Sequence, residues 1–209
     1  MTVDVAPYVI DYPDAPISWA GIFGRDCPVE LEIGSGKGLF LCNAGAARPG
    51  RGFLGVEIAR KYAHEAAVRI AKRDLRNVRM LAGDARRFLH LFVPPASVDA
   101  LHVYFPDPWW KKRHKKRRVF CEPFVVDAAA ALKPGGDFHI VTDVEEYHGV
   151  IRELMDSRPE FLFHEPPSPT EPEHELDYLT NFERKYRIEG RPIYRSYYRR
   201  IDPSSTGLQ

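Results

Sequence analysis

The chain is poor in cysteine and lacks the residue spacings that usually hold metal ions. Its three cysteines, Cys27, Cys42 and Cys121, are odd in number, lie far apart and include no C-x-x-C pair. This pattern argues against a disulfide framework and fits thiols in a reducing compartment. The eight histidines show neither an H-x₃₋₅-H nor an H-E-x-x-H spacing, so we predict no metal site.

Long apolar segments are also absent. No run reaches the roughly 18 uninterrupted apolar residues that a membrane-spanning helix needs. The first residues, MTVDVAPYVIDYPD, show no basic segment followed by an apolar run. The sequence therefore predicts a cytoplasmic protein without a membrane partner. A hydrophobic fraction of 44% over 209 residues suffices for one core of ordinary size.

The net charge of the chain is small, but positive charge is concentrated in one place. The formal net charge is +1, and the segment KKRHKKRR at 111–118 carries seven positive charges, so subtracting these leaves −6 on the rest. A compact basic segment on a mildly acidic chain indicates an anionic partner that binds at one place. An import signal and a solvated face are the alternatives that charge alone leaves open.

Apolar, β-branched runs alternate with segments that are apolar at helical spacing. The expected strands span 29–34, 52–58, 77–84, 98–107, 137–143, 160–165 and 193–201, and the expected helices span 39–47, 59–73, 120–132 and 144–157. This alternation predicts an α/β fold, with a mostly parallel sheet covered by helices on both faces. Sheets of this kind bind ligands at the carboxyl ends of their strands.

The two ends of the chain and one late segment lack such patterns. We expect an N-terminal arm at 1–25, one domain at 26–202 and a flexible tail at 203–209. The segment 166–179 is rich in Pro and Glu, so we expect a mobile loop that closes residues 180–183 over a bound ligand.

A glycine turn follows the first expected strand. In EIGSGKG the glycines are Gly34, Gly36 and Gly38, and Leu39 stands where a nicotinamide or flavin fingerprint would have its third glycine. No G-K-[ST] ends the turn, so it is not a phosphate-binding P-loop. Glycine permits positive φ and a close approach of ligand to backbone. A sharp connection without any ligand remains the alternative.

Acidic residues lie at or near the ends of five consecutive expected strands. They are Glu32, Glu57, Asp84, Asp107 and Asp143. Since parallel strands end at one edge of a sheet, these acids should converge there. Each can instead cap the following helix, and for Asp84 this alternative is the strongest. An acidic edge disfavours a polyphosphate and favours a cationic ligand with a ribose and an adenine. S-adenosylmethionine has all of these features.

Five motifs occur in an order that resembles one known family. They are LEIGSGKG, GVE, GDA, YFPDPW with KKRHKKRR, and TNFERKYRIEG, and the match around them runs from about Trp19 to about Arg200. Together they resemble the bacterial tRNA (guanine-N7)-methyltransferases, which belong to the class I S-adenosylmethionine-dependent methyltransferases. One departure is Trp110, which stands where many relatives have Pro or His. The N-terminal arm is also shorter than in some relatives.

The resemblance implies a fold, a reaction and a set of site residues. The fold is a Rossmann-like, doubly wound sheet of seven strands with a final antiparallel strand. The reaction transfers a methyl group from S-adenosylmethionine to N7 of a guanine in tRNA, at position 46 of the variable loop. No metal or obligate protein partner is implied, and the chain is a monomer or a homodimer. The implied residues are Glu32, Gly34, Gly36, Gly38, Glu57, Asp84 and Asp107 for the cofactor, Asp107 for catalysis, and Lys111, Asp143, Thr180, Asn181, Phe182 and Glu183 for the substrate.

The chemistry of guanine N7 limits what the site has to do. N7 carries a lone pair and no proton, so methylation needs no prior deprotonation. We therefore expect Asp107 to orient the guanine and stabilise the cationic product, with a general base as the alternative. The basic segment should bind RNA phosphates, which position a nucleic acid without reading its sequence. The residues expected to do so are Lys112, Arg113, Lys115, Lys116, Arg117 and Arg118.

The aromatic residues beside Asp107 allow two interpretations. Trp109 and Trp110 can stack on the target base, or at least one of them can fill space beneath the turn. Tyr104 and Phe105 are expected in the core of the preceding strand. Alternative functions are a methyltransferase for small molecules or proteins, which leaves the basic segment without a role, and an RNA-binding module that has lost its cofactor. The intact glycine turn and the acids argue against the second.

Overall fold

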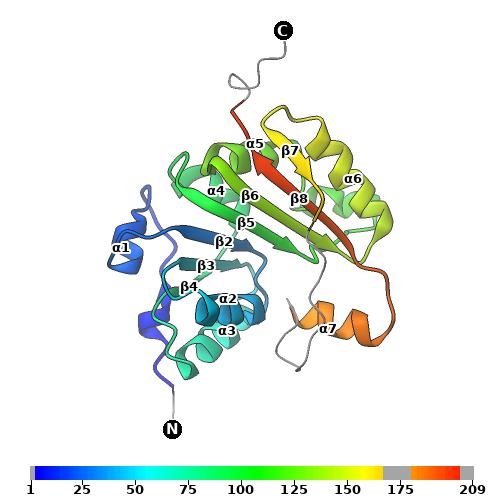
Figure 1. The fold of residues 1–209 in the computed structure, drawn as a ribbon. Helices are drawn as coiled ribbons and strands as arrows, with labels where there is room; N and C mark the ends of the chain where they lie inside the picture. The colour runs from blue at the N-terminus through cyan, green and yellow to red at the C-terminus, as the bar shows by residue number, and fades with distance from the viewer. Residues whose placement is uncertain (1–2, 167–179, 203–209) are drawn as a thin grey trace.

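The computed structural model describes residues 3–166 and 180–202 (Figure 1). Apart from residue 166, the loop expected at 166–179 lies outside the described residues, and so does the tail expected at 203–209. Within the described chain, eight strands form one sheet. They are β1 (Val9–Ile10), β2 (Val29–Ile33), β3 (Gly52–Glu57), β4 (Val78–Ala82), β5 (Val98–Tyr104), β6 (Leu132–Thr142), β7 (Phe161–His164) and β8 (Tyr194–Arg200).

The order of the strands is β1-β4-β3-β2-β5-β6-β8-β7, and β8 alone runs opposite to the other strands of the sheet. This confirms the expected mostly parallel sheet with its late antiparallel strand. All residues of β2 and β3 are buried, so these strands bury Glu30, Glu32 and Glu57 among their apolar residues. The order places β2 and β5 side by side in the middle of the sheet, where consecutive connections turn in opposite directions. Ligands bind at such a position in open α/β sheets.

Helices cover both faces of the sheet. They are α1 (Trp19–Phe23), α2 (Leu39–Ala47), α3 (Arg60–Lys72), α4 (Ala85–Phe92), α5 (Glu122–Ala131), α6 (Glu145–Asp156) and α7 (Asn181–Ile188), with 3₁₀ turns η1 (Ala6–Tyr8) and η2 (Lys112–Arg117). Figure 1 shows α2 and α3 on one face and α4, α5 and α6 on the other. Each group buries its own cluster of apolar side chains against the strands.

The N-terminal arm is more ordered than its sequence indicates. Its strand β1 extends the sheet beyond the seven expected strands by pairing with β4, Val9 opposite Met80 and Ile10 opposite Leu81. Tyr8 is buried beside it and donates from its hydroxyl to Asp74 at 2.5 Å. A strand of two residues is too short to show a period-2 pattern, so the sequence alone did not predict it.

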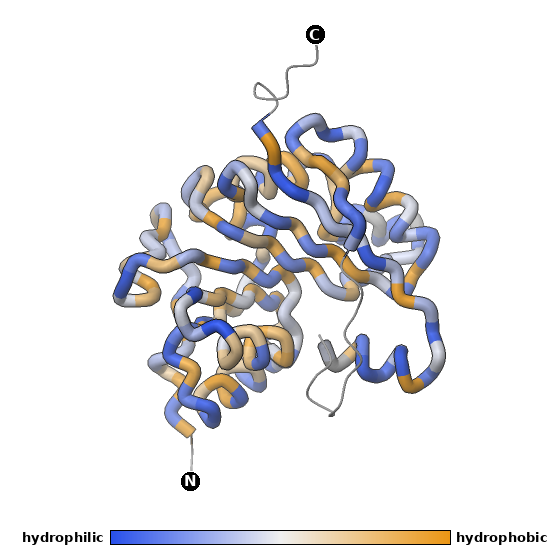
Figure 2. The backbone as a smooth tube through the Cα atoms, viewed as in Figure 1, coloured by the Kyte–Doolittle hydropathy of each residue, from blue (hydrophilic) through white to orange (hydrophobic). Residues whose placement is uncertain are grey.

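Helix α7 differs from the other helices in its surroundings. Figure 2 shows it as mostly hydrophilic, and in Figure 1 it stands apart from the sheet near the ends of β5 and β6. Its connection to the sheet is aromatic, because the ring of Phe105 lies 5.4 Å from Tyr186 and 6.0 Å from Phe182. The helix therefore lies beside the carboxyl ends of β5 and β6.

Candidate active site

The carboxyl ends of β2, β3, β4 and β5 meet at one edge of the sheet. Ile33 of β2 is the register partner of both Val56 of β3 and Val103 of β5, while Glu57 pairs with Ala82 of β4. The glycine turn, Glu57, Asp84 and Asp107 are at or just beyond these positions. The structure thus brings the predicted cofactor residues of four separate motifs to the same edge.

The glycine turn uses each glycine for a definite reason. Gly34, Gly36 and Gly38 have φ values of 75°, 52° and 70°, a region that side chains with a Cβ rarely adopt. A Cβ on Gly38 would lie 2.8 Å from the Cβ of Ala66, so this glycine permits close packing of α3. A Cβ on Gly34 or Gly36 would meet no protein atom within 4 Å. The backbone of these two residues is therefore open to a ligand.

Glu57 holds the turn in place. It is 8% exposed and accepts hydrogen bonds from the backbone N–H groups of Gly36 at 2.9 Å and Ala59 at 2.8 Å. These bonds tie the turn after β2 to the beginning of α3. A carboxylate has about four lone-pair positions, so two backbone donors leave it able to accept ribose hydroxyls as well.

Asp84 is the N-cap of α4, as the alternative interpretation of the sequence allowed. Its Oδ1 accepts from the backbone N–H groups of Arg86 at 2.9 Å and Arg87 at 3.3 Å. Both bonds use Oδ1, so Asp84 can cap the helix and still accept a hydrogen bond from a ligand at Oδ2.

Glu32 is the most unusual acid at this edge. It is 3% exposed, and among the described residues its Oε2 has no hydrogen-bond partner. Burial, reinforced by the neighbouring charge of Glu57, raises the pKa of Glu32 to about 8. A buried oxygen without a donor beside a turn that is open to a ligand fits a site for a cationic cofactor.

The segment after β5 presents Asp107 on an exposed loop with a strained backbone. Phe105 and Trp109 have positive φ values of 52° and 43°, which are uncommon for bulky residues. Trp109 is partly buried between His114, at 5.6 Å between ring centroids, and the guanidinium of Arg117, at 5.0 Å. Trp110 is 56% exposed. Trp109 thus packs within the loop, and Trp110 presents a free surface.

The basic segment is not a uniform charged face. Lys111, Arg113, Lys116 and Arg117 are exposed, and the side chains of Lys112 and Lys115 are not among the described ones. Arg118 differs from the prediction. It is 7% exposed, donates from Nε to the carbonyl of Pro108 at 2.7 Å and lies over the ring of Tyr147 at 4.7 Å. Arg118 therefore fastens the loop to the fold and has little surface for a phosphate.

The predicted substrate residues near α7 make contacts that the sequence did not indicate. Thr180 is the N-cap of α7 and accepts from the N–H of Glu183 at 3.0 Å. Glu183 is buried and accepts from Arg195 at 2.5 Å. Phe182 is 52% exposed, and the side chain of Asn181 is outside the described set.

Asp143, which follows β6, is bound by Arg191. The guanidinium of Arg191 in turn lies 4.0 Å from the ring centre of Tyr186. Asp143 and α7 are thus joined through one arginine. Sequence reasoning missed Tyr186, Arg191 and Arg195, because no local motif marks the partners of a distant acid.

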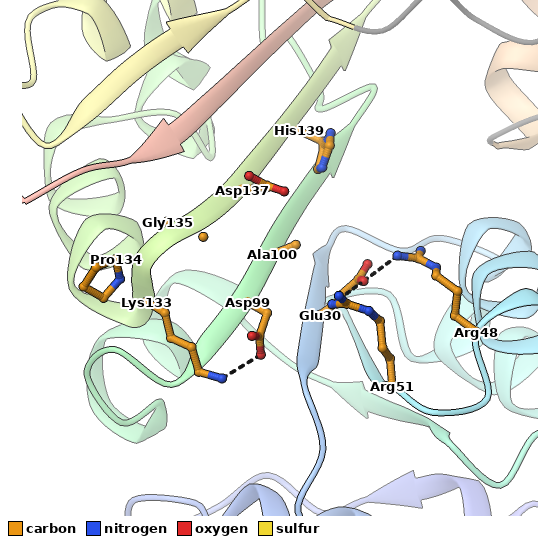
Figure 3. Close-up of a pocket in the computed structure, with 11 residues that line it drawn as sticks. Glu30, Arg48, Arg51, Asp99, Ala100, Lys133, Pro134, Gly135, Asp137 and His139 are labelled. Carbon is orange, nitrogen blue, oxygen red and sulfur yellow. Dashed lines mark hydrogen bonds and ion pairs between the residues drawn. The ribbon is translucent and has the colours of Figure 1, made fainter.

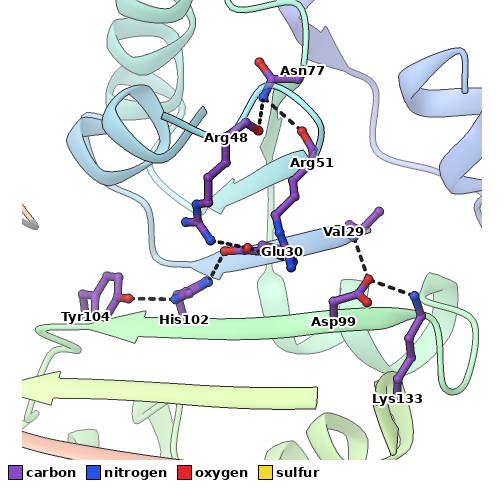
Figure 4. A network of polar contacts seen from close by, with 9 residues as sticks. All are labelled: Val29, Glu30, Arg48, Arg51, Asn77, Asp99, His102, Tyr104 and Lys133. Carbon is purple, nitrogen blue, oxygen red and sulfur yellow. Dashed lines mark hydrogen bonds and ion pairs between the residues drawn. The ribbon is translucent and has the colours of Figure 1, made fainter. Parts of the chain in front are cut away.

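A buried polar network joins β2 to β5 below this edge (Figure 4). Glu30 accepts from Arg48 at 2.5 Å and lies 2.9 Å from Nε2 of His102, whose Nδ1 lies 2.7 Å from the hydroxyl of Tyr104. Burial lowers the pKa of His102 despite the bond to Glu30. The imidazole is then neutral, donates from Nε2 to Glu30 and accepts from Tyr104 at Nδ1.

A polar cavity of about 270 Å³ lies near the amino ends of β2 and β5, away from the predicted site residues (Figure 3). Its charged groups pair with one another or with close neighbours. Arg48 and Arg51 bind Glu30, and Lys133 binds Asp99 at 2.9 Å. These pairs leave little uncompensated charge for a ligand, and none of the predicted cofactor residues lines the cavity.

Two further properties concern the part of the chain that the structure covers. Among residues 3–166 and 180–202, no group of three or more His, Cys, Asp and Glu side chains is arranged to hold a metal ion. None of the helices in these ranges has the length and apolar character that crossing a membrane requires.

Comparison with known proteins decides the family. A family model described as "Putative methyltransferase" matches residues 26–196. The tRNA (guanine-N(7)-)-methyltransferase of Rhodopirellula baltica is 44% identical over 192 residues, which cover 89% of this chain and 71% of that protein. The protein of the same name from Klebsiella pneumoniae is 33% identical, with 92% and 80% covered. The chain belongs to the tRNA (guanine-N7)-methyltransferase family. This confirms the resemblance that the five motifs carry.

Solved structures support the fold of this family member. The 16S rRNA methyltransferase KamB superposes with a TM-score of 0.63 at 15% identity, over 88% of this chain and 93% of that one. The 30S ribosomal A1408 methyltransferase from an uncultured bacterium gives 0.56 at 15% identity, over 87% and 92%. These structures share the Rossmann-like methyltransferase architecture, and at such identities the likeness concerns the fold alone.

Proposed function

We propose that this member of the family transfers the methyl group of S-adenosylmethionine to N7 of a guanine in tRNA and so produces 7-methylguanosine. The observation that carries the proposal is that one edge of the sheet holds both the open glycine turn and the acids Glu32, Glu57 and Asp84. Asp107 lies at the same edge, and the basic segment 111–118 follows it directly in the chain. From the family we further propose position 46 of the variable loop as the target. A tRNA substrate also agrees with the cytoplasmic location predicted from the sequence.

The residues at this edge fit S-adenosylmethionine. Gly34 and Gly36 offer backbone that a ligand can approach, and the buried Oε2 of Glu32 is without a donor. Glu57 would accept the ribose hydroxyls, and the Oδ2 of Asp84 would accept an adenine amine. The cofactor supplies an electrophilic methyl group on a sulfonium, and its two positive charges suit an acidic site.

Asp107 is proposed to orient the guanine. N7 needs no deprotonation, whereas transfer of a methyl cation leaves the purine positively charged. A carboxylate beside the base can accept from guanine N–H groups and stabilise this charge. Exposure of Asp107 on a loop that Arg118 fastens to the fold suits a group that must meet a macromolecular substrate.

Exposed basic residues next to Asp107 are proposed to hold the RNA backbone. Arg113, Lys116 and Arg117 lie within ten residues of the acid and are exposed. Phosphate contacts at this position would place the variable loop without reading its sequence. Trp110, which is exposed in the same loop, is available to stack on an unpaired base.

Substrate variants test both parts of the proposal. Unmodified tRNA transcripts are incubated with the protein and S-adenosylmethionine, alongside transcripts in which adenine replaces the guanine at position 46. We expect methylation of the first and none of the second. Methylation of both at one other guanine would contradict the position, and methylation of neither would contradict the RNA substrate.

Single-turnover rates of Asp107→Asn, measured over a range of pH, address the two possible roles of Asp107. Binding of the target tRNA to this variant is measured alongside. An orienting role predicts weaker binding of the target guanine together with a reduced rate, whereas a base predicts loss of methylation at every pH with guanine binding unaffected.

A further inference from the structure

Two glutamates of β2 provide a comparison within one strand. Glu30 and Glu32 point to the same face of the sheet and are 2% and 3% exposed. Glu30 is bound by Arg48, Arg51 and His102. Although burial opposes ionisation, the bond with His102 and the arginine charges lower the pKa of Glu30. Glu30 is therefore ionised and fully compensated.

Glu32 has the same burial without the same compensation. The titratable groups that face it are Glu57 from β3, Tyr104 from β5 and Cys42 from α2, and none of them is a cation. An ionised carboxylate that is removed from water and lacks donors costs several kcal/mol, so such a group takes up a proton instead. Arg48 and Arg51 are engaged with Glu30.

We propose that Glu32 is a neutral carboxylic acid in the cofactor-free protein and releases its proton to solvent when S-adenosylmethionine binds. The inference rests on the function proposed above, because it requires a cationic ligand at the open glycine turn. The pKa of Glu32, raised to about 8 by burial and by Glu57, supports the neutral form at pH 7. Cationic groups of the ligand supply the positive charge that the protein itself does not place beside this carboxyl.

Proton release gives Glu32 a role in distinguishing substrate from product. S-adenosylmethionine carries both a sulfonium and an ammonium, whereas S-adenosylhomocysteine has lost the sulfonium charge. The ionised form of Glu32 is therefore stabilised more by the substrate than by the product. After transfer, the carboxyl recovers its proton more readily, which weakens the hold on the product and favours its release.

Isothermal titration calorimetry in buffers of different ionisation enthalpy counts the protons released at pH 7.0, where the ammonium of the ligand stays protonated. For a group with a pKa of about 8, we expect close to one proton released per S-adenosylmethionine bound, and fewer for S-adenosylhomocysteine. The dissociation constant for S-adenosylmethionine should rise up to about tenfold from pH 7.0 to pH 6.0. Glu32→Gln should release no proton.

Infrared difference spectroscopy keeps the proposal testable if Glu32→Gln binds no ligand. The free wild-type protein at pH 7.0 should show a carboxylic acid C=O band that S-adenosylmethionine abolishes. This band should be missing from free Glu32→Gln and retained in the matched variant Glu30→Gln, because Glu30 is already ionised. Tight binding without proton release, or a free protein without the band, would overturn the inference and leave the proposed function intact. A wild-type protein that binds no S-adenosylmethionine would contradict both.

Discussion

Adding one methyl group to the glycine turn can show whether its glycines are needed only for the backbone conformation or also for contact with the ligand. Gly36→Ala puts a Cβ on a residue with φ of 52°, where no protein atom lies within 4 Å. Gly24, at the end of α1, has φ of 70° and is equally open, but it is remote from the candidate site. Gly24→Ala is therefore a matched control for the backbone cost.

Both substitutions should destabilise the fold by a similar amount. The left-handed conformation costs a residue with a Cβ about 1–2 kcal/mol, and neither methyl group collides with the protein. For a domain of this size, each kcal/mol corresponds to a fall in melting temperature of about 2–4 °C. Calorimetric unfolding of Gly36→Ala and Gly24→Ala without ligand measures this common cost.

Cofactor affinity should distinguish the two variants. If S-adenosylmethionine lies against the turn, the methyl group of Gly36→Ala occupies its space, at a cost of about 1–3 kcal/mol for overpacking. This corresponds to a dissociation constant raised about 5- to 150-fold, while Gly24→Ala should bind like the wild type. Titration calorimetry measures both constants. Wild-type affinity in Gly36→Ala, together with the expected loss of stability, would refute a ligand on this turn.

Three further predictions follow from charge and burial. Arg113→Ala and Lys116→Ala should each lower the slope of log binding constant against log salt concentration for tRNA by about one, and leave S-adenosylmethionine affinity unchanged. Filter binding at several salt concentrations measures the slope, and an unchanged slope would contradict the phosphate contacts. Arg118→Ala should instead lower the free energy of unfolding by about 2 kcal/mol, because it removes a buried charged donor, and an unchanged urea midpoint would count against this. Burial lowers the pKa of His102, and that of His139 to about 4, so the unfolded chain binds more protons below about pH 6.5. Glu32, whose pKa is raised, opposes this trend, so the test uses Glu32→Gln. Its stability should fall between pH 6.5 and pH 4, by up to about 1.4 kcal/mol per pH unit for each histidine, and equal urea midpoints of this variant at pH 7.0 and pH 5.5 would contradict it.

Local patterns account for the parts of the fold that the sequence predicted. The residues of β2 and β3 are buried throughout, and short segments rich in apolar residues, VELEI and GFLGVE, mark both strands in the sequence. The glycine turn was also predictable, because three residues with positive φ favour glycine regardless of their surroundings. The meeting of the acids was predictable as well, because residues at the carboxyl ends of parallel strands lie at one edge of the sheet.

Contacts between distant residues explain what the sequence could not show. Glu30 and Glu32 are the same residue type on the same face of one strand, yet their pKa values shift in opposite directions, because Arg48 and His102 lie beside only one of them. In the sequence, Arg118 cannot be distinguished from its basic neighbours, because its contacts with Tyr147 and with the carbonyl of Pro108 arise only in the folded chain. The short strand β1 forms only because β4 is present to pair with it.

The most direct test of the proposed function follows the methyl group. The protein is incubated with S-adenosylmethionine labelled in its methyl group and with unmodified tRNA, and the RNA is then treated to cleave the chain at 7-methylguanosine. We predict label in the tRNA and cleavage at one site in the variable loop. RNA that stays unlabelled would contradict the RNA substrate, and labelled RNA that resists this cleavage would contradict N7 as the acceptor.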